Sequence, residues 1–214
     1  MQTGLTGAIY RISDWVMRLV YVNLLWIAFT LIGFGVLGFF PATIAMYSVC
    51  RKWVMGEQDI PIFKTFIHSY KSELGKGNML GLCLVATLYI LWVDYRVLQT
   101  AGDGFLYNIA YLFFLLIVFY GGFLLFFFPM YVHYELKVRH LVKNTFLIVI
   151  ASPLTTIVMI TLGLLVYYLS LSISGVLLFF SGSTIAFFSM RISYRVFQKV
   201  DGKRTRPNLR TFTG

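Results

Sequence analysis

The sequence predicts an all-α protein that crosses a membrane several times. Hydrophobic residues make up 59% of the 214-residue chain and charged residues only 12%, whereas soluble domains carry about 25% charged residues. The mean hydropathy is +0.80, and apolar runs of near-spanning length recur from residue 19 to residue 190. We therefore expect residues 1–214 to form a single integral membrane domain in contact with the lipid bilayer.

The basic character of the chain fits this class. The formal net charge is +10, and the basic residues flank the apolar runs, as the positive-inside rule and anionic headgroups favour. No basic patch has the folded platform that nucleic-acid recognition needs, so we expect no nucleic-acid partner. Cys50 and Cys83 lie in or beside apolar runs and are expected to be packed free thiols.

The first apolar run sets the topology. Residues 1–18 resemble a short interfacial helix, and the 32 residues of Leu19–Cys50 then carry no charge. As one helix they would measure roughly 48 Å, against a hydrocarbon core of about 30 Å. Either one span ends near Phe40, which gives five spans in all, or the chain turns through residues 33–41 into a hairpin of two short helices, which gives six.

Basic residues favour the hairpin. With six spans, 17 of the 18 Lys and Arg residues are cytoplasmic and only Arg96 lies outside. A single first span moves Arg11 and Arg18 outside as well, which leaves 15 of 18 inside. The sequence therefore predicts six membrane helices in a bacterial cell membrane, with both termini cytoplasmic.

Four later runs complete the predicted spans. They cover residues 79–93, 105–132, 146–168 and 171–190. Pro129 and Pro153 should kink or end helices because proline donates no backbone hydrogen bond. Small residues, among them Gly77 and Gly81, allow close helix packing. The segment after Arg191 is expected to be an interfacial helix, followed by a disordered basic tail over residues 202–214.

An amphipathic helix is predicted between the hairpin and the next span. Its apolar side chains recur with helical spacing, and polar side chains fill the other face. Such a cytoplasmic helix can lie among headgroups, pack under its own bundle or contact a partner. The candidate partner-binding residues are Phe63, Phe66, Ile67, Tyr70 and Leu74.

Residues for catalysis or metal binding do not form a recognisable pattern. His133 and Glu135 are two residues apart and would point to different faces of a helix, so they do not favour a metal site. No catalytic triad, phosphate-binding glycine loop or pair of inward carboxylates can be assembled. We therefore expect neither an enzyme nor a cofactor.

One motif resembles a known family. The segment Pro-Ala-Thr-Ile-Ala-Met-Tyr-Ser-Val-Cys-Arg-Lys-Trp-Val-Met-Gly-Glu, followed by Pro-Ile-Phe-Lys-Thr-Phe, is similar to the YesL family of bacterial integral membrane proteins. Phe40 departs from the family, which usually has glycine before the proline. The motif residues of the predicted turn and inner interface are Pro41, Ala42, Thr43, Tyr47, Arg51, Lys52, Trp53, Gly56 and Glu57.

The resemblance implies a role beside carbohydrate uptake. It implies a non-enzymatic accessory subunit of an ABC-type oligosaccharide or sugar importer, with permease subunits as partners. The alternative is a stand-alone small carrier whose helices enclose a sugar path. Direct contact with carbohydrate stays open.

Overall fold

The computed structural model describes residues 5–100, 104–134, 136–172 and 174–204, and within these ranges it is all-helical. This confirms the all-α part of the predicted fold class. The helices are α1 (Leu5–Ile32), α2 (Val36–Val54), α3 (Ile62–Glu73), α4 (Lys76–Gln99), α5 (Phe105–His133), α6 (Val138–Ala151), α7 (Pro153–Ser172) and α8 (Ser174–Arg204).

The chain reverses between α1 and α2, inside the region where the hairpin was predicted. Phe34 and Gly35 adopt positive φ angles of 56° and 75°, and the Gly35 N–H donates to the Thr30 carbonyl at 2.8 Å. The turn therefore precedes Pro41, which lies inside α2. Our assignment of Pro41 to the turn was wrong, because the two glycines around Phe34 already allow the reversal. Residues 5–18 are also continuous with α1.

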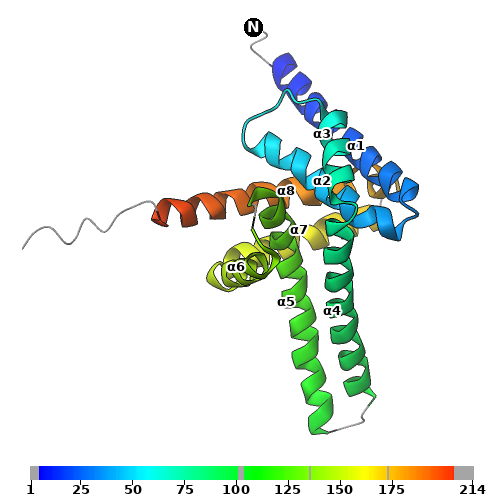
Figure 1. Cartoon of the computed structure of the whole chain (residues 1–214), viewed down its shortest axis with the longest axis vertical. Coiled ribbons are helices and arrows are strands. Elements are labelled where there is room, and N and C mark those ends of the chain that lie inside the picture. The colour runs from blue at the N-terminus through cyan, green and yellow to red at the C-terminus, as the bar shows by residue number, and fades with distance from the viewer. Residues whose placement is uncertain (1–4, 101–103, 135, 173, 205–214) are drawn as a thin grey trace, which may run out of the picture.

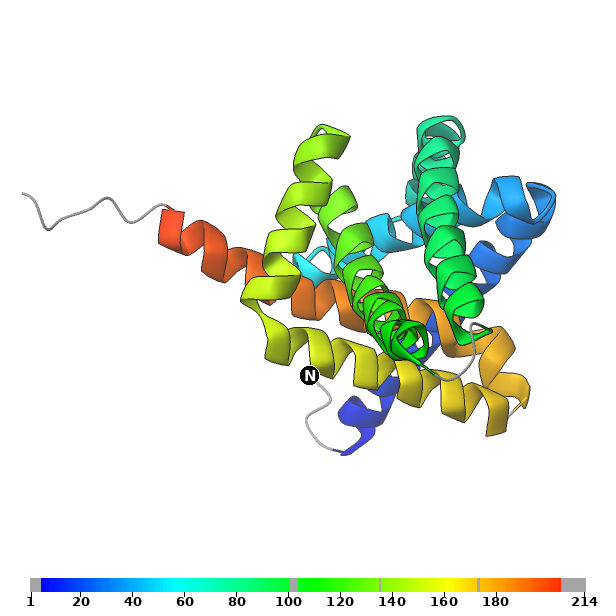
Figure 2. The ribbon, with the colours of Figure 1, turned by 90° about the horizontal axis from the view of Figure 1, so that it is seen from below.

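The helices do not form a parallel bundle. In Figure 1, α4 and α5 run side by side as a long arm that extends away from α1, α2 and α3, whereas α8 runs across the top of that arm. Figure 2 looks along the same molecule from below and shows α7 and α8 on one side of the arm. The predicted interfacial helix after Arg191 is the second half of α8, and residues 205–214 of the predicted tail lie outside the described residues.

The predicted span over residues 146–168 is not one straight helix. α6 ends at Ala151, α7 begins at Pro153, and the two helices are bent by 96°. Because Pro153 has no N–H to donate, the helical ladder cannot pass through it without a break. Pro129 has a milder effect, since α5 continues through it to His133.

Candidate membrane spans are fewer than the six predicted. In the described part of the chain, three segments are long and apolar enough to cross a membrane: Tyr10–Ile32, Lys76–Gln99 and Asn108–His133. The bent α6–α7 pair would make a fourth. The helices therefore support a membrane protein with several spans.

Helix α2 is the centre of the fold. It contacts α1, α3, α4, α5 and α8, and most of its side chains from Pro41 to Trp53 are buried. One core cluster joins α2 to α1, α3 and α8. A second cluster joins the arm to α6, α7 and α8. Ala42, Tyr47 and Trp53 of the family-like motif thus belong to the first cluster.

Candidate functional site

The motif residues of α2 fall into two groups. Pro41, Ala42, Thr43, Tyr47 and Trp53 are buried. Arg51 and Lys52 are half-buried in the last turn of the helix, and Gly56 and Glu57 follow it at the surface. The structure therefore brings one group together in the core and leaves the other at the end of the helix.

Thr43 connects α2 to α1. The indole N–H of Trp26 donates to Thr43 Oγ1 at 3.0 Å, and the same hydroxyl donates to the Phe39 carbonyl at 2.7 Å. Both the lone pair and the proton of the threonine are thus used. The spacing of the motif did not indicate Trp26 as its partner, because the contact spans two helices.

Tyr47 connects α2 to α8 and α5. Its hydroxyl lies 2.9 Å from Ser189 Oγ, and Ser189 donates its own proton to the Ala186 carbonyl. Tyr47 is therefore the donor in this pair. The ring stacks on Phe128 with centroids 5.5 Å apart and planes 14° apart. The tyrosine hydroxyl therefore has a hydrogen-bond partner, and its ring has an aromatic neighbour.

The end of α2 is closed by a Schellman motif. Gly56 has a φ of 101°, its N–H donates to the Trp53 carbonyl at 3.1 Å, and the Glu57 N–H donates to the Lys52 carbonyl at 3.0 Å. This explains the Gly-Glu pair in the motif. Trp53 itself packs against Trp15 and Phe187, which also contact each other.

The amphipathic helix is present as α3 and packs against its own chain. Phe66 and Tyr70 are buried, Ile67 is half-buried, and Phe63 and Leu74 are 47% and 43% exposed. The Tyr70 hydroxyl donates to the carbonyl of Phe29 in α1 at 3.1 Å. Of the five candidate partner-binding residues, only Phe63 and Leu74 are therefore largely at the surface in this conformation.

Several clefts open between the described helices. One, of about 740 Å³, lies between α1, α2, α5, α7 and α8 and is mostly apolar. We call it the glycine groove, because Gly121 of α5 and Gly163 of α7 line it and have no atom within 4 Å of the position of an added Cβ. Its wall also includes Trp26, Thr43 and Tyr47.

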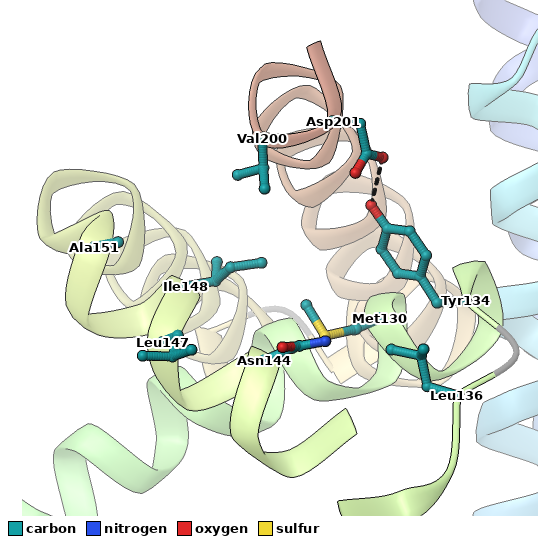
Figure 3. A pocket seen from close by; sticks show the side chains of 9 residues that line it. All are labelled: Met130, Tyr134, Leu136, Asn144, Leu147, Ile148, Ala151, Val200 and Asp201. Atoms are coloured by element: carbon teal, nitrogen blue, oxygen red, sulfur yellow. Dashed lines mark hydrogen bonds between the residues drawn. The ribbon is translucent and has the colours of Figure 1, made fainter. Parts of the chain in front are cut away.

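A second cleft, of about 590 Å³, lies between the α3–α4 junction and the α5–α6 junction. It is lined by both apolar and charged side chains. A third, of about 280 Å³, lies between α5, α6 and the end of α8. Figure 3 shows Tyr134 at its edge, donating to Asp201 at 2.7 Å, above Met130, Leu147 and Ile148.

Comparison with known proteins identifies relatives over nearly the whole chain. It is 37% identical over 201 residues to the protein named "Uncharacterized protein YteU" of Bacillus subtilis (strain 168), which covers 92% of this chain and 89% of the relative. It is 34% identical over 201 residues to "Uncharacterized protein YesL" of the same organism, with 94% and 95% covered. No solved structure matches the chain.

A family model agrees with these relatives. The model described as "Protein of unknown function, DUF624" matches residues 19–95. That range contains α2, α3 and the first part of the arm, including every motif residue discussed above. The chain therefore belongs to the DUF624 family and is a relative of YesL and YteU.

Proposed function

We propose that the protein is a non-enzymatic membrane accessory subunit that holds a membrane partner in the glycine groove. The observation that carries this proposal is the open space over Gly121 and Gly163 in an apolar cleft of about 740 Å³. Small residues at helix surfaces let a second helix approach closely in a membrane. A helix with its side chains is about 10–12 Å wide, so the volume of the groove equals that of roughly one and a half helical turns.

The partner class follows from the family resemblance. We propose a permease subunit of an ABC-type sugar importer, which is the partner that the resemblance to the YesL family implies. A permease subunit consists of membrane helices, which suit a groove with an apolar wall. The relatives' names state no partner, so this assignment depends on the experiment below.

The alternative, a sugar carrier, finds less support in the lining of the groove. A sugar site needs hydrogen-bonding groups that are available to hydroxyls. The Trp26 indole and the Thr43 hydroxyl bond each other, and the Tyr47 hydroxyl is engaged by Ser189. These polar groups already have partners inside the protein, which favours a helix over a sugar.

Co-purification from native membranes tests the proposal. We expect the tagged protein to recover permease subunits, identified by mass spectrometry, at a constant ratio after solubilisation in mild detergent. Recovery as a lone protein that takes up sugar after reconstitution into vesicles would contradict it and support the carrier.

We also propose a topology in which both termini and α3 are cytoplasmic. The distribution of basic residues supports it, as does the reversal before α2, which leaves Arg18 hydrogen-bonded to the Gln58 carbonyl and 3.7 Å from Asp59. These contacts support placing the first half of α1 and the end of α2 on the same side of the membrane. The six-pass version further requires α2 and α8 to cross the membrane.

Cysteine labelling tests the topology. In a background without Cys50 and Cys83, a cysteine at Gln2 should resist an impermeant thiol reagent in intact cells and react after the cells are opened. Rapid labelling in intact cells would place the N-terminus outside and rule this topology out.

A further inference from the structure

The cleft of about 590 Å³ differs from the glycine groove in its charge. It lies between the start of α4 and the connection from α5 to α6. Lys76 enters it from α4 and Lys137 from the residue before α6. Two cations therefore face one cleft from separate segments of the chain.

The acidic residue on the wall does not neutralise both of them. Glu73 is the acid among the described residues that line this cleft, and it accepts a hydrogen bond from the Tyr131 hydroxyl at 2.6 Å. In the described part of the chain, neither Lys76 nor Lys137 forms an ion pair. The cleft thus keeps a positive charge and two ammonium donors for a ligand.

The wall becomes apolar along α4. Met79, Leu80 and Cys83 follow Lys76 at i+3, i+4 and i+7, so all four share one face of the helix. The face changes from an ammonium group to apolar side chains within roughly 10 Å. A ligand that matches this wall has an anionic head and an apolar chain.

The cleft also lies at the ends of two candidate membrane spans, where lipid headgroups are expected. The candidate spans Lys76–Gln99 and Asn108–His133 begin and end beside it. The ends of membrane spans lie at the level of lipid headgroups. The apolar residues of the wall lie farther along the span, at the depth of the acyl chains.

We propose that this cleft binds an anionic phospholipid, with its phosphate between Lys76 and Lys137 and its acyl chain along Met79, Leu80 and Cys83. The apolar wall favours a lipid over a soluble phosphate, which would leave that wall unused. The two lysines favour an anionic headgroup over a zwitterionic one, because each cation near the membrane surface attracts net negative charge. This site does not depend on the glycine groove or its partner.

Native mass spectrometry of the purified full-length protein tests the lipid preference. In detergent with equal phosphatidylglycerol and phosphatidylcholine, we expect several-fold more phosphatidylglycerol to stay bound. Lys76→Gln with Lys137→Gln should abolish that preference, because each lysine near the membrane surface attracts anionic lipid. Lys64→Gln with Lys71→Gln removes the same charge from the exposed face of α3 and should leave it unchanged. Equal losses in both double variants, or no preference in the wild type, would overturn the proposal.

Cys83 reports whether the lipid occupies this cleft. It is exposed, whereas Cys50 is fully buried. Phosphatidylglycerol should therefore slow alkylation of Cys83 by N-ethylmaleimide in the wild type and not in the Lys76→Gln/Lys137→Gln variant. Inorganic phosphate should have no effect. Equal slowing by inorganic phosphate would show a soluble-anion site instead, and an unchanged rate with bound lipid would place the lipid elsewhere.

Discussion

At the scale of single residues, Asn78 compensates for the proline inside α2. Pro41 has no N–H to donate to the carbonyl of Leu37, four residues earlier. The Asn78 side-chain amide of α4 donates to that carbonyl at 2.9 Å and to the Leu74 carbonyl at 2.7 Å. A proline in the middle of the core helix is therefore tolerated because a neighbouring helix supplies the missing donor.

A double-mutant cycle tests this pairing. Asn78→Leu should destabilise the protein by about 1 kcal/mol through the lost hydrogen bond, or a few degrees in melting temperature. In a Pro41→Ala background, the introduced alanine has a backbone N–H that can serve the Leu37 carbonyl, so the same change should cost less. The measurement is the temperature at which buried Cys50 becomes reactive in a Cys83→Ser variant. Equal costs in both backgrounds would mean that the two residues are not coupled.

At the scale of helices, α2 and α4 are joined by the Gly77 and Gly81 pair. A Cβ on Gly81 would lie 2.1 Å from the Phe40 ring, and one on Gly77 would lie 2.9 Å from Ile44 Cδ1. Phe40 and Ile44 are four residues apart on α2 and fill the space over the two glycines. Gly77 and Gly81 therefore allow close packing of two helices within the protein, as predicted. They leave no room there for a helix of a partner.

Alanine at Gly81 and alanine at Gly121 should affect the stability of the protein differently. Gly81→Ala should destabilise the protein by about 1–3 kcal/mol, because α2 and α4 must separate to admit the methyl group. Gly121→Ala meets nothing within 4 Å and should be neutral or stabilising by up to about 1 kcal/mol, because alanine favours the helix. Thermal unfolding of the purified protein compares them. If Gly81→Ala is as harmless as Gly121→Ala, the helices are not packed as described.

At the scale of the whole molecule, the features that could be predicted from the sequence were those that depend on local hydrophobic periodicity and on the distribution of charge. The apolar spacing from Phe63 to Leu74 identified α3, and the basic residues identified the reversal before α2. Pro153 correctly predicted a break in the helix, but the span predicted over residues 146–168 still ran through it, because an apolar run records length and hydropathy but not helix direction. The burial of Thr43 and Tyr47 was equally hidden, since their partners Trp26 and Ser189 lie in other helices.

The accessory role depends on occupation of the glycine groove, and blocking that groove tests it most directly. Gly121→Trp and Gly163→Trp place a bulky ring in the groove, at two positions where an added Cβ meets no atom within 4 Å. Ile90→Trp adds bulk at an exposed position of α4 outside the groove. Permease subunits recovered from native membranes should fall at least fivefold for both groove variants and stay constant for Ile90→Trp, with unchanged melting temperatures. Undiminished recovery with the groove blocked would contradict the account.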